Sequence, residues 1–181
     1  MKKLLILLIL LFILINPTKA LAKENQDSSP SAVMETIQYE IPYPGLLPDN
    51  PLYYLKVIRD NILKFLISDP LKKTEFSLLQ ADKRLGGAKL LLDKGKAELS
   101  ITTLSKSGNY FEDAISNVQK AKKEGEDVNA ILDQLLKASQ KHQEIILGMQ
   151  NGQKGDTLLN LKFLEQRAKD FQERVLIIKS Q

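Results

Sequence analysis

The sequence predicts an all-α protein, an up-and-down antiparallel helical bundle of about five helices that follows an extended N-terminal segment. Three observations indicate this fold. From residue 50 on, apolar residues recur in alternating steps of three and four, the spacing of one buried face of a helix. Short breaks rich in proline, glycine, aspartate and asparagine divide this region into five pieces. No β-rich segment interrupts these pieces.

The first 22 residues are predicted to be a signal peptide for export. Lys2-Lys3 precedes an unbroken apolar run over residues 4–15, and Ala20-Leu21-Ala22 forms a cleavage site. The run is too short to span a bilayer, which needs roughly 18 to 20 apolar residues. We expect cleavage after Ala22 and an extracytoplasmic mature protein, either secreted or in a bacterial cell envelope. The alternative is an uncleaved signal that anchors the chain in the membrane.

Composition excludes several classes of function. The chain has no cysteine, which excludes disulfides, thiolate metal sites and a cysteine nucleophile. The signal carries three of the 26 lysines and arginines and none of the 22 acidic residues, so the mature chain is almost neutral. A near-neutral chain offers no basic field to attract nucleic acid. We therefore expect no nucleic-acid partner, and nothing in the composition calls for a cofactor.

Two segments precede the helices. Residues 23–32 are polar and lack periodicity, so they are predicted to be a disordered tether. Residues 33–49 are predicted to be an extended lead-in, in which Ile37, Tyr39 and Ile41 alternate with polar residues. A single strand has no partner within this chain, so we expect the lead-in to lie along the helices. The alternative is that it adds as a strand to another protein.

Residues 50–181 are predicted to form the helical bundle domain, and its first helix spans residues 51–67. Asn50 suits the N-cap of this helix, and Pro51 suits its first position because the missing N–H would be unpaired there anyway. Eleven of the 17 residues are apolar. We therefore expect most of the circumference of this helix to be covered, and the helix to pack across the bundle.

A second start signal, Asp69-Pro70, opens a helix that runs to about Lys94. The third helix is predicted from Ala97 to Glu124. Its first half is rich in weak helix formers, which leaves a break near Gly108 open.

The last two helices are predicted from Asp127 to about Gln150 and from Asp156 to about Lys179, with each aspartate as the N-cap. Connections of two to six residues make neighbouring helices antiparallel. In each of these helices one stripe of mostly apolar residues, here called the seam, is expected to face the core. The seam of the helix from Asp127 comprises Val128, Ile131, Leu135, Ala138, His142, Ile145 and Met149. The seam of the helix from Asp156 comprises Leu161, Leu164, Ala168, Phe171, Val175 and Ile178.

One run of motifs resembles a known family. Residues 43–56 read YPGLLPDNPLYYLK, and they are followed by SDPLKKTE at 68–75 and LQADKRL at 79–85. This pattern resembles an uncharacterised bacterial family, known only as a domain of unknown function in exported or membrane-attached proteins. The resemblance covers about a third of the chain, implies a helical extracytoplasmic domain and transfers no catalytic residue. Gly86-Gly87 departs from the family pattern and leaves the continuity of the second helix open.

Three residues are candidate contacts for a ligand. His142 is the only histidine and the only ionisable residue on its seam. One histidine cannot build a multi-histidine metal site, and the patterns Glu-x-x-His and His-Glu-x-x-His are absent. We expect no metal site and no catalytic residue, and a hydrogen-bonded His142 near one end of the bundle. Tyr53 and Tyr54 are expected to form an aromatic cluster that pins the lead-in, with a ligand pocket as the alternative.

These observations favour a non-enzymatic exported helical domain, an interaction or structural module of the bacterial cell envelope. The expected contact is an exposed apolar strip, either on helix 51–67 or at Ile37, Tyr39 and Ile41, that binds an envelope protein or a second copy of the chain. Membrane contact is expected only through an uncleaved signal or through helix 51–67.

The alternative function is an extracytoplasmic bundle that binds a small ligand or ion. Its pocket would lie in the bundle interior near Tyr53, Tyr54 and His142.

Overall fold

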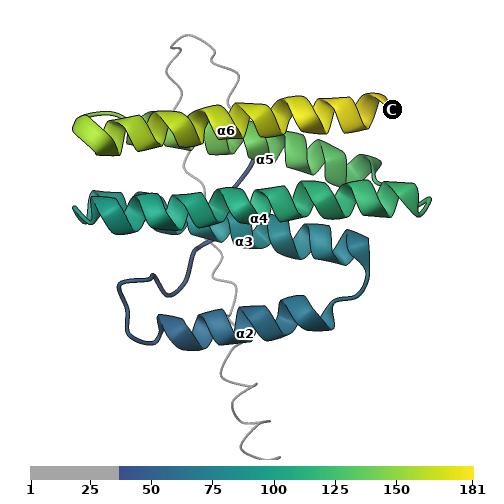
Figure 1. The fold of residues 1–181 in the computed structure, drawn as a ribbon, viewed down its shortest axis with the longest axis horizontal. Helices are drawn as coiled ribbons and strands as arrows, with labels where there is room; N and C mark the ends of the chain where they lie inside the picture. Colours follow the sequence, from purple (N-terminus) through teal and green to yellow (C-terminus); the bar gives the residue numbers. More distant parts are fainter. Residues whose placement is uncertain (1–36) are drawn as a thin grey trace, which may run out of the picture. The chain divides into compact units, whose positions relative to one another are not determined.

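A computed structural model gives the structure of residues 37–181. Within this range the chain forms five α-helices and no β-strand, which confirms the predicted all-α class (Figure 1). The helices are α2 (Tyr53–Leu66), α3 (Pro70–Asp93), α4 (Ala97–Lys123), α5 (Asn129–Met149) and α6 (Gly155–Ser180). The predicted signal peptide, the tether and residues 33–36 of the lead-in lie outside the described residues.

Four of the helices form the bundle as two antiparallel hairpins, α3 with α4 and α5 with α6. The hairpins pack so that α4 lies beside α6 and α3 lies beside α5 (Figure 1). The connection from α4 to α5 therefore joins helices that lie diagonally across the bundle. Two clusters of buried apolar side chains fill the space between the hairpins.

The predicted seam of the last helix is confirmed. All six of its residues are buried in α6: Leu161, Leu164, Ala168, Phe171, Val175 and Ile178. The seam of α5 is buried in the same way, apart from the partly buried Ile145. The alternating steps of three and four thus identify the faces that these two helices turn toward the core.

Small side chains let α3 and α4 approach each other closely. Ser100 Oγ donates to the carbonyl of Ala88 at 2.7 Å, and Ser107 Oγ donates to the carbonyl of Ala81 at 2.7 Å. Both hydroxyls are buried, and each is satisfied by a backbone oxygen of the facing helix. Hydrogen bonds therefore join α3 to α4 at two positions along the hairpin.

The glycine pair in α3 makes room for the lead-in. The helix is continuous through Gly86-Gly87, as α4 is through Gly108, so neither position breaks a helix. A Cβ on Gly86 would lie 3.3 Å from Ile41 Cγ2, and a Cβ on Gly87 would lie 3.3 Å from Leu47 Cδ2. Because glycine has no side chain, the lead-in lies directly on the surface of α3.

The described part of the lead-in, residues 37–49, lies along the bundle as expected. Tyr39 packs against one core cluster and Ile41 against the other. Asp49 pairs with Lys94 at 3.2 Å and with Lys96 at 2.9 Å, and the hydrogen bond from Lys96 lowers the pKa of the Asp49 carboxyl. The lead-in is therefore fixed by apolar packing near its start and by ion pairs near its end.

The start of α2 differs from the prediction by two residues. Asn50 and Pro51 form a turn before the helix, in which Asn50 Oδ1 accepts a hydrogen bond from the backbone N–H of Leu52 at 2.9 Å. The helix itself begins at Tyr53. At α3 the predicted cap is confirmed, because Asp69 Oδ1 accepts from the backbone N–H of Lys72 at 2.8 Å.

The caps predicted for the last two helices are wrong. Val128 holds the N-cap position of α5, and Asp127 Oδ1 accepts from the backbone N–H of Asn129 in a turn just before it. α6 begins at Gly155, which places Asp156 inside the first turn. There its negative charge still interacts favourably with the positive end of the helix dipole.

The prediction that most of the first helix is covered is wrong. α2 runs alongside the α3–α4 hairpin and does not cross the bundle (Figure 1). Most of its large apolar side chains are exposed, whereas its only acidic residue, Asp60, is buried. The reason is that cations and a tyrosine on one stripe of α2 lie against polar and aromatic groups of α3 and α4.

Candidate functional site

The most unusual surface in the described part of the chain is the side of α2 that points away from the bundle. With 3.6 residues per turn, six large apolar side chains project from the half of the helix opposite Asp60. Each is between 53% and 86% exposed. We call this set the outer face of α2; it comprises Tyr54, Leu55, Ile58, Ile62, Phe65 and Leu66.

The stripe of α2 that faces the bundle is polar and aromatic. Lys64 Nζ donates to Asp113 Oδ2 of α4 at 2.6 Å and lies 5.3 Å from the ring centre of Tyr110. Lys56 Nζ donates to the carbonyl of Pro44 at 2.6 Å, and burial lowers the pKa of this amine. These contacts hold α2 to α4 and to the lead-in.

Asp60 lies in the middle of the same stripe and is only 1% exposed. Its Oδ1 accepts from Arg59 Nε at 3.2 Å and from Arg59 Nη2 at 2.8 Å. On the facing side, the Arg84 guanidinium of α3 stacks 4.1 Å from the ring centre of Tyr110. Turning α2 by half a turn would separate Lys64 from Asp113 and would place the apolar row against the Arg84 guanidinium, so these polar contacts hold the observed side of α2 toward the bundle.

This orientation reverses the usual arrangement of an amphipathic helix. A surface helix of a globular domain normally turns its apolar stripe inward. In α2 the apolar stripe is exposed to solvent, and it forms a contiguous row along the helix. Contiguous exposed apolar patches on a soluble domain mark sites of interaction with a protein, a ligand or a membrane. The outer face of α2 is therefore the strongest candidate for a binding surface.

A second notable feature is a buried polar network in the bundle. His142 Nε2 lies 2.7 Å from Asp82 Oδ1, and the Tyr39 hydroxyl donates to Asp82 Oδ2 at 2.5 Å. The Phe111 ring packs edge-on against His142 with 5.1 Å between ring centres, and it stacks on Phe171 at 4.8 Å. Both oxygens of the carboxylate are therefore used, and the network joins the lead-in, α3 and α5.

The expected position of His142 needs a correction. It was expected near one end of the bundle, but it lies well inside α5 and pairs with Asp82, which is well inside α3. Sequence reasoning missed Asp82. The available signal was its spacing, because Asp82 follows Leu78 by four positions and precedes Leu85 by three, and both leucines are buried.

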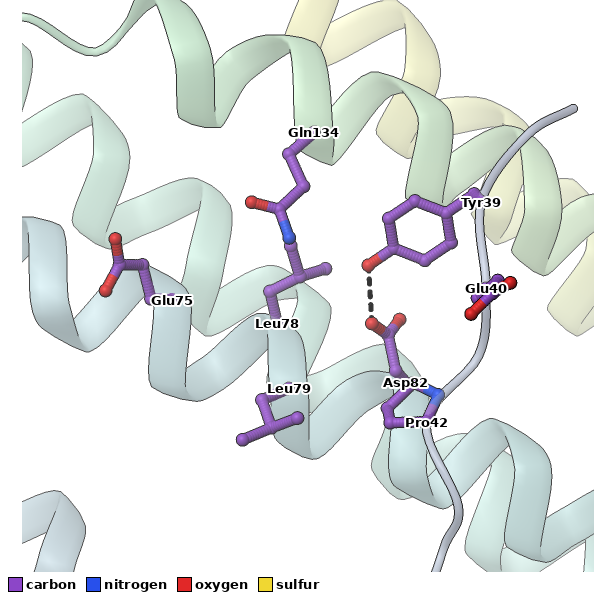
Figure 2. Close-up of a pocket in the computed structure, with 8 residues that line it drawn as sticks. All are labelled: Tyr39, Glu40, Pro42, Glu75, Leu78, Leu79, Asp82 and Gln134. Atoms are coloured by element: carbon purple, nitrogen blue, oxygen red, sulfur yellow. Dashed lines mark hydrogen bonds between the residues drawn. The ribbon is translucent and has the colours of Figure 1, made fainter. Parts of the chain in front are cut away.

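A groove opens beside this network (Figure 2). Its volume is about 370 Å³, and Tyr39 and Asp82 face each other at its edge from the lead-in and from α3. The other lining residues are Glu40, Pro42, Glu75, Leu78, Leu79 and Gln134. His142 itself lines a cavity of about 10 Å³, which holds at most one water molecule.

The hydroxyl of Tyr39 gives the network a pH dependence. Burial raises the pKa of Tyr39 well above its usual value of about 10, and the negative charge of Asp82 raises it further. The folded-state pKa is thus higher than the unfolded-state pKa. The contribution of this group to stability is therefore complete below about pH 10 and is lost as the pH rises above that value.

We expect the Tyr39→Phe substitution to make stability less sensitive to alkali. The wild-type free energy of unfolding should fall more steeply above about pH 10, by up to about 1.4 kcal/mol per pH unit from this group. Urea unfolding at neutral pH and at about pH 11 measures the difference. The Tyr43→Phe substitution is the control, since Tyr43 is exposed. Equal alkaline losses in both variants would contradict the assignment.

The structure places the predicted contact residues in different surroundings. Tyr54 belongs to the outer face of α2, whereas Tyr53 is half-buried on the opposite side of the same helix, where burial raises the pKa of its hydroxyl. His142 lies in the core. The lead-in residues Ile37, Tyr39 and Ile41 are all partly buried.

Residues 37–181 lack two features that would point to other functions. No group of three or more histidine, cysteine, aspartate or glutamate side chains there could hold a metal ion. In the same range no helix is both long enough and apolar enough to cross a membrane.

Comparison with known proteins gives one match. The model of a family described as "Domain of unknown function (DUF5667)" matches residues 45–162, more than half of the chain. This range contains the outer face of α2 and the Asp82–His142 pair. No match was found among curated proteins or among solved structures.

Proposed function

This chain belongs to the DUF5667 family, and from that premise we propose that it is an exported, non-enzymatic binding module of the bacterial cell envelope that docks through the outer face of α2. The observation that carries the proposal is the orientation of this helix. Its apolar side chains are in water while its buried carboxylate and its lysines face the bundle. A helix held in this way presents a preformed binding surface.

Burial of the outer face would provide a substantial driving force for docking. Complete burial of one large apolar side chain is worth about 1.5–3 kcal/mol. Six side chains that are more than half exposed therefore offer on the order of 5–10 kcal/mol before the entropy cost of association. No other helix in the described range has such a continuous exposed row. The exposed Leu159 and Phe163 of α6, for example, share their side of the helix with the polar residues Asp156, Gln166 and Asp170.

Export and the absence of catalysis are parts of the same proposal. The apolar run over residues 4–15 supports export. The buried network supports a structural role for the single histidine, because His142 and Tyr39 each bind one oxygen of Asp82 and so link α5 and the lead-in to α3.

Sedimentation with envelopes isolated from the natural host tests the proposal. Residues 23–181 contain all five described helices and both core clusters, so this mature chain is suitable. We expect the wild type to pellet with the envelopes and the double variant Ile58→Glu/Ile62→Glu to remain in the supernatant. The matched control is Leu159→Glu/Phe163→Glu, which adds the same charge at the same spacing on α6. Failure of the wild type to pellet, or equal pelleting of both variants, would refute docking through α2.

A second candidate function is the binding of a small ligand, which the groove beside Tyr39 and Asp82 favours. Its volume of about 370 Å³ is near the lower end of the range for small-molecule sites. A ligand bound there would contact the lead-in, α3 and α5 together. It should raise the melting temperature once its concentration exceeds its Kd, and from there with the logarithm of its concentration. A screen of small envelope metabolites in which none raises the melting temperature would count against this function.

A further inference from the structure

The geometry points to a lipid bilayer with anionic headgroups as the partner of the outer face of α2. In this arrangement α2 lies flat in the headgroup region, with its outer face in the acyl boundary and the four-helix bundle above it. The inference rests on the proposed docking through α2 and specifies what the helix docks to. Three properties of the outer face favour a bilayer over another protein.

The first property is the distribution of side chains along the helix. Over its 14 residues, about 21 Å at 1.5 Å per residue, the outer face carries no charged side chain. Tyr54 lies near its start and Phe65 near its end. Tyrosine favours the boundary between headgroups and acyl chains, and phenylalanine is common on the apolar face of helices that lie there. An uninterrupted apolar face on a helix that is polar on its other side is typical of helices that lie in the membrane interface.

The second property is charge. α2 contains three cations, Lys56, Arg59 and Lys64, and one acid, Asp60. The acid is buried against the bundle, so no carboxylate of α2 would meet the headgroups. Arg59 is half-exposed at the border of the outer face. Although Arg59 pairs with Asp60, three cations against one acid leave α2 with a net charge of +2. This charge attracts anionic headgroups while the apolar side chains of the outer face enter the acyl boundary.

The third property is the size of the surface compared with what a second copy would need. A strip about 21 Å long and about 10 Å wide is all that one helix offers. A stable protein–protein interface usually buries about 800 Å² on each partner. Each partner in such an interface usually contributes roughly 20–30 residues, whereas the outer face of α2 has six large apolar side chains, so two copies that met only through α2 would form a small interface. A bilayer needs no complementary pocket, and it covers a convex helix along its whole length.

Flotation with protein-free vesicles tests the inference. The probes are vesicles of phosphatidylcholine alone and vesicles of phosphatidylcholine and phosphatidylglycerol in equal parts, each mixed with residues 23–181. We expect the wild type and the Leu159→Glu/Phe163→Glu control to float with the anionic vesicles. The Ile58→Glu/Ile62→Glu variant should bind at least about tenfold more weakly, because it places two carboxylates in the acyl boundary. Circular dichroism and melting curves check that both variants are folded.

Each other outcome has a definite meaning. Equal flotation with neutral and anionic vesicles would overturn the role assigned to headgroup charge. Equal flotation of the two double variants would overturn the role of α2. A wild type that pellets with host envelopes but floats with neither vesicle would overturn the lipid inference alone, since its partner would then be an envelope protein. A wild type that binds neither envelopes nor vesicles would overturn the proposed function as well.

Discussion

Replacement of Asp82 by alanine is expected to lower the free energy of unfolding by about 2–6 kcal/mol, or about 1–3 kcal/mol for each of the two groups that lose a partner. The substitution leaves His142 Nε2 and the Tyr39 hydroxyl without their shared partner inside the bundle. A buried donor or acceptor that loses its partner carries the full cost of its desolvation, so the loss should exceed that from removal of an exposed pair. Urea unfolding at neutral pH measures the loss.

The matched control for this prediction is Asp93→Ala. Asp93 lies on the same helix but is half-exposed, and it pairs with Lys89 four residues earlier. Exposed pairs of this kind contribute about 0.3–0.5 kcal/mol. If Asp82→Ala were no more damaging than Asp93→Ala, the Tyr39–Asp82–His142 network would not be the structural link between lead-in, α3 and α5 that its geometry indicates.

Replacement of Gly87 by leucine is expected to cost about 1–3 kcal/mol, the usual range for overpacking. The new side chain would occupy the space of the lead-in, since even a Cβ would lie 3.3 Å from Leu47 Cδ2 and 3.7 Å from Pro44 Cβ. Displacement of the lead-in would also remove the carbonyl of Pro44 from Lys56 Nζ. The variant should therefore loosen α2 as well, which faster amide exchange in residues 53–66 would show.

Gly148→Leu provides the comparison for this second prediction. Gly148 is also helical, but a Cβ there would meet nothing within 4 Å. Leucine is a better helix former than glycine by up to about 0.8 kcal/mol, so this variant should be neutral or slightly more stable. A Gly87→Leu variant as stable as Gly148→Leu would show that the lead-in is not packed against the glycine pair.

The helical core was predictable from sequence because the patterns that determine the buried faces and the helix starts lie within a few neighbouring residues. The steps of three and four in α6 correctly identified all six of its buried seam residues. The Asp69-Pro70 start of α3 was also correct, since the Asp69 side chain bonds the backbone three residues later. Such signals depend only on neighbours within one or two turns of a helix.

The direction of α2 was not predictable for a physical reason. Periodicity shows which residues share a face, but it does not show which face turns inward. That choice depends on partners far away in sequence, such as Asp113, which lies 49 positions from Lys64. A row of leucine and isoleucine suggested burial, whereas the contacts of Lys64 and the burial of Asp60 turn that row toward solvent. The same limit explains Asp82, whose partner His142 is 60 positions away.

The most direct test of docking through α2 is the accessibility of a single thiol on its outer face. The chain has no cysteine, so Phe65→Cys introduces a unique thiol there, and Phe163→Cys introduces one at a similarly exposed position of α6. Each variant is treated with a maleimide with and without an excess of isolated host envelopes, and the modified fraction is read by mass. Our account predicts that envelopes slow the modification of Phe65→Cys by at least about tenfold and leave Phe163→Cys unchanged. Equal rates at Phe65→Cys with and without envelopes would contradict it.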